Sequence, residues 1–261
     1  MTPIDRRDLF RSSAAAIAAF GLGNGLADDA SAASLSDETA DEKMSCSPFT
    51  KDAVILFQGD SITDAHRDRS RQNANDAKSL GDGYPFMIAS DLLRDYPEKR
   101  LTVYNRGISG NKVPDLQSRW QTDCLDLKPN VLSVLVGVND IWHKLGGRYD
   151  GTVEDYRTGL TALLQQTQDA LPQIRIVLCE PFVLRCGAVT DKWFPEFTER
   201  LEVARSVAKE QSLTRVPFQE MFDEAVKEAP PQYWAADGVH PTLAGHSLMA
   251  KTWRNVVEHV V

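Results

Sequence analysis

The chain has 261 residues, of which 42% are hydrophobic and 25% charged, a length and composition typical of one large globular domain. Its 29 Lys and Arg against 37 Asp and Glu give a formal net charge of -8 at pH 7. This acidic balance argues against nucleic acid or an anionic membrane surface as a partner and favours a neutral substrate.

The first 33 residues predict a twin-arginine-type signal peptide. Arg6-Arg7-Asp8-Leu9-Phe10 precedes an apolar run over 13–27 that is too short and too rich in glycine to span a membrane, and small residues for cleavage follow it. We expect export to the periplasm or the outside, with no membrane span in the mature protein; the alternative is a cytoplasmic tail that mimics a signal. Residues 34–50 are acidic and predict a linker, and residues 51–261 form the predicted catalytic domain.

The first strand of this domain ends at a serine. The apolar run Val54-Ile55-Leu56-Phe57 predicts a buried strand that stops at Gly59-Asp60-Ser61. Ser61 is therefore expected at the carboxyl edge of a sheet, where open α/β sheets bind ligands. The alternative is an ordinary turn. The long polar stretch 64–83 that follows predicts a functional loop.

The rest of the chain alternates helices with strands. Apolar spacing predicts helices at 84–96, 114–120, 154–171, 196–210 and 242–257, and strands at 101–105, 131–136, 174–179 and 215–217. This alternation predicts a single-domain three-layer α/β/α sandwich around a flavodoxin-like parallel sheet of about five strands. The aliphatic run 131–136 is typical of a central strand, and Pro217 favours an edge strand.

Polar residues follow the strand ends and also occupy a C-terminal loop. Since the carboxyl ends of parallel strands share one edge, we expect Ser61, Gly110, Asn139, Asp237 and His240 to converge there. A serine nucleophile needs an imidazole base, and the base needs a carboxylate that fixes its tautomer. The backbone N–H groups of Ser61 and Gly110 and the Asn139 amide can stabilise an oxyanion.

Four motifs resemble, in order, the blocks of the SGNH (GDSL-type) hydrolases: Gly59-Asp60-Ser61, the glycine of Ile108-Ser109-Gly110-Asn111, Gly137-Val138-Asn139-Asp140 and Asp237-Gly238-Val239-His240-Pro241. Longer strings are similar to bacterial acetylxylan esterases of this type: Gly81-Asp82-Gly83-Tyr84, Asn105 to Asn111, Asp115-Leu116 with Arg119-Trp120, Gly137 to Trp142, and His240 to His246. Ile62, where the family name has Leu, is a conservative difference.

The resemblance implies a serine esterase that removes O-acetyl groups from carbohydrates through an acyl-enzyme. It implies Ser61 as nucleophile, His240 as base and Asp237 as orienting acid, with Ser61, Gly110 and Asn139 forming the oxyanion hole. It implies no metal or organic cofactor. The partner is then an acetylated carbohydrate, and an oligomer is left open. The alternatives are a lipase, lysophospholipase or thioesterase-like hydrolase and, from another class, a glycan-binding module without catalysis.

Three aromatic residues near these motifs, Tyr84, Trp142 and Trp234, are candidates for binding a sugar ring, with core packing as the alternative. His143 and His246 are the other histidines considered as the base; His143 lacks a suitably spaced carboxylate apart from Asp140, and His246 is predicted inside the last helix.

Four cysteines in an exported protein permit disulfides. Cys179 and Cys186 are the favoured pair, which leaves Cys46 and Cys124 for each other; four free thiols are the alternative. No Cys or His spacing resembles a metal site. We expect Asp64 and Asp140 to accept hydrogen bonds from loop backbone groups.

Overall fold

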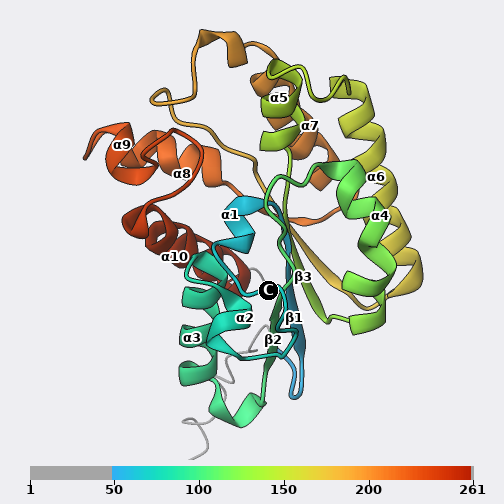
Figure 1. Ribbon diagram of the computed structural model, residues 1–261. Helices are drawn as coiled ribbons and strands as arrows, with labels where there is room; N and C mark the ends of the chain where they lie inside the picture. Colours follow the sequence, from blue (N-terminus) through green and yellow to red (C-terminus); the bar gives the residue numbers. More distant parts are fainter. Residues whose placement is uncertain (1–48, 260–261) are drawn as a thin grey trace, which may run out of the picture. The chain divides into compact units, whose positions relative to one another are not determined.

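The computed structural model describes residues 49–259 (Figure 1). The predicted signal peptide, residues 34–48 of the predicted linker and Cys46 lie outside this range. Within it, no helix combines the length and the apolar character needed to cross a membrane.

The centre of the fold is a five-stranded parallel sheet in the order β2-β1-β3-β4-β5. The strands are β1 (Val54–Gly59), β2 (Thr102–Asn105), β3 (Val131–Leu135), β4 (Arg175–Cys179) and β5 (Thr214–Val216). This is the predicted flavodoxin-like order, with β5 at an edge. All residues of β3 are buried, because helices cover both faces of a central parallel strand.

Ten α-helices surround the sheet in the described range: α1 (Ser61–Asp64), α2 (Ala77–Leu80), α3 (Tyr84–Asp95), α4 (Val113–Asp123), α5 (Val138–Leu145), α6 (Val153–Ala170), α7 (Glu196–Glu210), α8 (Phe218–Ala225), α9 (Pro231–Trp234) and α10 (Leu243–His259). In Figure 1, α3, α8 and α10 lie on one side of the sheet and α4, α6 and α7 on the other. A hydrophobic core lies on each side of the sheet. Phe57 and Trp253 belong to the core beneath α3, α8 and α10, and Leu56, Trp120 and Tyr156 belong to the core beneath α4, α6 and α7. The predicted three-layer sandwich is confirmed. The sequence assigned no helix to α5 or α8.

The polar stretch 64–83 covers the free edge of β2. The Asn75 side chain accepts a hydrogen bond from Val103 N (2.8 Å) and donates one to Leu101 O (2.9 Å), while its backbone N–H donates to Val103 O (3.0 Å). Exposed strand edges invite pairing with other chains. Asn75 therefore protects a sheet edge, a structural role for part of a stretch that was predicted to be functional.

The predicted Cys179–Cys186 disulfide is wrong, because both residues and Cys124 carry free thiols. Cys179 is buried in β4 and lies 3.5 Å from Ser133 Oγ. Cys186 lies beyond β4, where its thiol donates to Ala235 O (3.3 Å). The two side chains thus have separate partners, and the free-thiol alternative holds for these three cysteines.

Candidate active site

Three distant residues meet at the carboxyl edge of the sheet. Ser61 Oγ lies 2.9 Å from His240 Nε2, and His240 Nδ1 lies 2.7 Å from Asp237 Oδ2. The structure therefore brings the predicted nucleophile, base and acid into one hydrogen-bonded chain.

The turn after β1 is built to present Ser61. A side chain at Gly59 would place its Cβ 2.4 Å from Leu135 O on β3 and 2.5 Å from Thr63 Oγ1, so only glycine fits this approach. Asp60 then caps α1, because its Oδ1 accepts a hydrogen bond from Ile62 N (3.0 Å). The chain turns sharply at the strand end, and Ser61 begins the helix half-buried.

The acid is held by both of its oxygens. Asp237 Oδ1 accepts hydrogen bonds from the backbone N–H groups of Val239 (2.9 Å) and His240 (2.7 Å), which leaves Oδ2 for the imidazole. Burial opposes ionisation, but the hydrogen bonds from the His240 ring and these backbone groups hold the pKa of Asp237 below its ordinary value. A carboxylate only accepts, so Nδ1 donates to it and Nε2 can take a proton from Ser61.

A support for this loop was missed by sequence reasoning. The segment 182–190 donates from Leu184 N to Gly238 O and from Ala188 N to Asp237 O, both at 2.8 Å. Gly238 has φ +86°, and a Cβ there would lie 2.5 Å from Cys186 O and Leu184 O. No motif marks this segment. The cysteines that bracket part of it indicated a disulfide instead.

The predicted oxyanion residues surround the same space. Gly110, Asn139, Ser61 and His240 all line a hollow of about 240 Å³. Within residues 49–259, the backbone N–H groups of Ser61 and Gly110 donate no hydrogen bond, and the Asn139 amide donates to Asn111 O at 3.2 Å. The two backbone N–H groups and the second N–H of the Asn139 amide are therefore available to a negatively charged oxygen. Their catalytic role stays a prediction.

Buried carboxylates tie the surrounding loops together, as expected. Asp64 Oδ2 accepts hydrogen bonds from Ser109 N (2.9 Å) and Ser109 Oγ (2.6 Å). Asp140 Oδ1 accepts one from Val113 N (3.4 Å). The loop that contains Gly110 is thereby attached to α1.

Of the three aromatic candidates, only Trp142 lines the hollow, with its ring centroid 5.7 Å from that of His240. Tyr84 is completely buried, and its hydroxyl lies 3.0 Å from Thr63 Oγ1. The Trp234 indole donates to backbone carbonyls at the end of α8 and just beyond it. The structure thus packs the side chains of Tyr84 and Trp234 away from the hollow, and a substrate-binding role for these two residues stays a prediction.

The two other candidate histidines are not bonded to Ser61. His246 lies on α10 and accepts a hydrogen bond from Tyr84 N (3.2 Å), and burial lowers its pKa to about 4. His143 lines the hollow together with Ser109 and Arg148, which the sequence did not single out as substrate contacts. Arg148 lies outside every motif.

Two acids beside the site are buried without full hydrogen bonding. Burial raises the pKa of Asp60 to about 7 and that of Asp140 to about 6, and the negative charge of Asp140 raises the pKa of Asp60 further. The Oδ2 atom of each has no partner in the described part of the chain. The folded protein therefore holds Asp60 in its neutral form in mildly acidic solution.

Stability should accordingly fall as the pH rises. The neutral form of Asp60 favours folding fully below pH 3.8, its unfolded pKa, and this advantage is lost as the pH rises through 7. Between pH 5 and pH 8 this carboxyl group should lower the free energy of unfolding of the wild type by about 2 to 3 kcal/mol. We expect Asp60→Asn, whose amide oxygen can still cap α1, to lack this decrease. Thermal unfolding of both proteins across this range measures the effect. If the stability of both proteins changed equally with pH, the decrease could not be assigned to Asp60.

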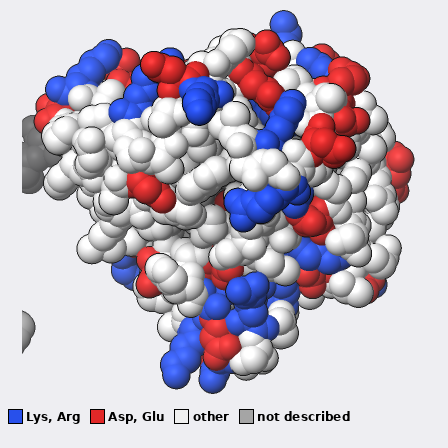
Figure 2. Space-filling view, turned by 45° about the horizontal axis from the view of Figure 1, so that its top comes forward, with Lys and Arg blue, Asp and Glu red and all other residues white. Residues whose placement is uncertain are grey.

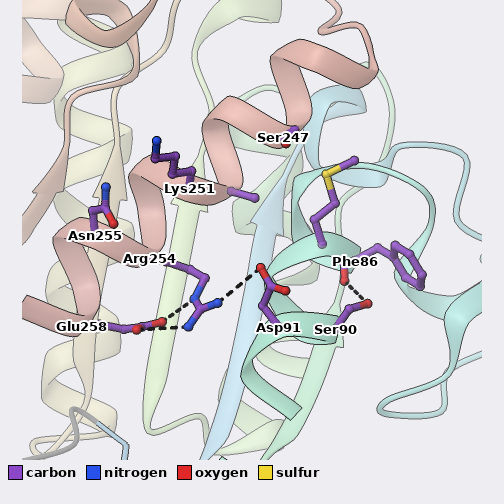
Figure 3. Close-up of a pocket in the computed structure, with 10 residues that line it drawn as sticks. Phe86, Ser90, Asp91, Ser247, Lys251, Arg254, Asn255 and Glu258 are labelled. Carbon is purple, nitrogen blue, oxygen red and sulfur yellow. Dashed lines mark hydrogen bonds and ion pairs between the residues drawn. The ribbon is translucent and has the colours of Figure 1, made fainter. Parts of the chain in front are cut away.

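A larger hollow of about 480 Å³ lies between α3 and α10, lined by neither Ser61 nor His240. Figure 3 shows Arg254 there between two carboxylates, Asp91 at 3.3 Å and Glu258 at 2.5 Å. The larger of these two hollows is therefore not the one that contains Ser61 and His240. In residues 49–259, no cluster of three or more His, Cys, Asp or Glu side chains could hold a metal ion.

Comparison with known proteins agrees with this arrangement. The model of the GDSL-like lipase/acylhydrolase family matches residues 57–248. An acetylxylan esterase of Geobacillus stearothermophilus is 33% identical over 204 residues, which cover 76% of this chain and 91% of that protein. The solved structure of a GDSL-like lipase from Parabacteroides merdae is 50% identical with a TM-score of 0.78, over 80% of this chain and 97% of the other. The structure of Axe2, an acetylxylan esterase from Geobacillus stearothermophilus, is 31% identical with a TM-score of 0.72, over 80% and 96%.

Proposed function

Because the chain belongs to the GDSL-like lipase/acylhydrolase family, we propose that it is a serine esterase that removes O-acetyl groups from carbohydrates, with Ser61, His240 and Asp237 as its catalytic triad. The observation that carries the proposal is the hydrogen-bonded chain from Ser61 to Asp237 beside a small hollow. Solved structures of Axe2 include catalytic mutants in which serine or histidine is replaced by alanine, the residue types proposed here.

The reaction has two halves. Ser61 Oγ attacks the acetyl carbonyl while His240 Nε2 takes its proton, and the oxyanion is stabilised by donors of Ser61, Gly110 and Asn139. The C–O bond to the sugar then breaks, and His240 returns the proton to the leaving hydroxyl. A water molecule deprotonated by His240 attacks the acetyl-enzyme, and acetate leaves as Ser61 regains its proton.

The lining of the hollow supports a short acyl group on a polar alcohol. A long acyl chain needs an extended apolar surface, and among the described residues that line this space Trp142 is the single large apolar side chain. Its indole can instead stack on a sugar ring. Figure 2 turns the edge where the strands end toward the viewer and shows a broad area with few charges, bordered by charged side chains of both signs. The lining of the hollow, with one indole among polar side chains, favours a sugar acetate over a lipid ester.

The test compares acyl chain lengths and substrates. We expect kcat/KM for 4-nitrophenyl acetate to exceed that for the octanoate by about 100-fold, because a six-carbon extension finds little apolar lining. Acetate release from acetylated xylo-oligosaccharides, followed by a coupled acetate assay, measures the carbohydrate activity. A preference for octanoate would favour the lipase or thioesterase alternative, and tight glycan binding without acetate release would favour the non-catalytic module. Export remains a prediction from residues 1–33.

A further inference from the structure

Arg148 lines the hollow beside Ser61, in the segment that follows α5. Its backbone N–H donates to His143 O at 2.8 Å, which closes the turn between them. The side chain is exposed. The rim of the proposed acetyl site therefore contains an arginine whose backbone is fixed by a closed turn.

This guanidinium has no partner in residues 49–259, whereas that of every other arginine there forms an ion pair or a hydrogen bond. Three carboxylates around the hollow are engaged elsewhere or buried. Asp237 bonds His240, Asp115 pairs with Lys112 at 2.6 Å, and Asp140 is buried. Arg148 is thus free to bind an anion from solution.

The local charge agrees with this reading. Burial lowers the pKa of His143, and the positive charges of Arg148 and Lys112 lower it further. The hollow thus has a cationic rim in a chain whose formal net charge is -8. The overall charge favoured a neutral substrate, but an enzyme can bind an anionic group through a local cation.

We propose that Arg148 binds a carboxylate on the sugar half of the substrate, so that the preferred ester is an O-acetyl group on or beside a uronic acid. This inference rests on the proposed function. An acetyl group carries no charge, so the anion belongs to the alcohol that leaves. A carboxylate on the sugar matches the planar guanidinium through two parallel N–H···O bonds.

The experiment uses two substrates of similar shape that differ at one group: an O-acetylated methyl glucuronoside, which carries a carboxylate, and its uncharged 6-amide. We expect the wild type to prefer the carboxylate in kcat/KM by about 10-fold or more, since hydrogen bonds to charged groups are the stronger ones. Arg148→Gln should lose this preference, because its kcat/KM on the carboxylate should fall toward its kcat/KM on the amide. Arg148→Lys should keep part of the preference, and added salt should weaken it in the wild type.

Lys251→Gln is the matched control, because Lys251 is an exposed cation that lines the other hollow, between α3 and α10 (Figure 3). It should leave the preference unchanged. Equal rates of the wild type on both sugars, or an equal loss on both in Arg148→Gln, would overturn the assignment of Arg148 and leave the esterase intact. Hydrolysis of 4-nitrophenyl acetate with no acetate from either sugar would instead refute the carbohydrate function, and this inference with it.

Discussion

Replacing Ser61 with alanine should lower kcat for 4-nitrophenyl acetate by about 10⁵-fold, because the acyl-enzyme cannot form without its Oγ. The Ser61 side chain is only half-buried, and its hydroxyl bonds the catalytic imidazole of His240. Its removal should therefore cost the fold little. The residual rate would come from the oxyanion donors acting on water. Initial rates measured with high enzyme concentrations, together with circular dichroism, separate lost chemistry from lost structure.

Ser90→Ala provides the control for this substitution. Ser90 is an exposed serine on α3 whose hydroxyl donates to Phe86 O at 2.8 Å, and it lies away from the triad. Its replacement should leave kcat unchanged. If Ser61→Ala instead turned over the ester at the wild-type rate, Ser61 would not be the nucleophile.

Asp237→Asn should lower kcat by about 10³- to 10⁴-fold. Asparagine can keep an oxygen toward the backbone N–H groups of Val239 and His240, so the loop should stay folded. The other position would then hold an NH₂ group facing His240 Nδ1, where it would favour the tautomer with a proton on Nε2. That imidazole cannot accept the Ser61 proton, and kcat would fall while KM changes little.

Asp169→Asn, at an exposed position on α6, serves as the matched control and should have no effect. Steady-state kinetics together with thermal unfolding distinguish the two roles that Asp237 can have. An activity loss that only followed a large drop in melting temperature would show that the residue supports the loop rather than the tautomer.

The centre of the sheet was predictable because β1, β3 and β4 are short, mainly apolar runs followed closely by glycine or a polar residue. β3 is wholly aliphatic apart from one serine, and its burial on both faces follows from that composition. Helices α5 and α8 were missed because each has eight residues and begins beside a strand-end motif or Pro217. Their helical state depends on packing that a local pattern does not contain.

The site was predictable as far as it follows from topology. Parallel strands that end on one edge bring Ser61 and Gly110 together, and the spacing of Asp237 and His240 fits one tight loop. The role of an aromatic residue near a motif was not predictable, since nothing in the local sequences of Tyr84 and Trp142 indicates that the first is buried and the second lines the hollow. The raised pKa of Asp60 was likewise not predictable, because segments distant in the sequence bury this carboxyl group.

Segment 182–190 holds the loop that contains Asp237 and His240 through backbone hydrogen bonds. They run from Leu184 N to Gly238 O and from Ala188 N to Asp237 O. Hydrogen bonds of this kind persist when side chains are exchanged. The segment can therefore accumulate substitutions at its exposed positions, such as Arg185, without displacing His240. Natural variation or engineering of the exposed side chains of this segment should therefore leave the positions of the acid and the base unchanged.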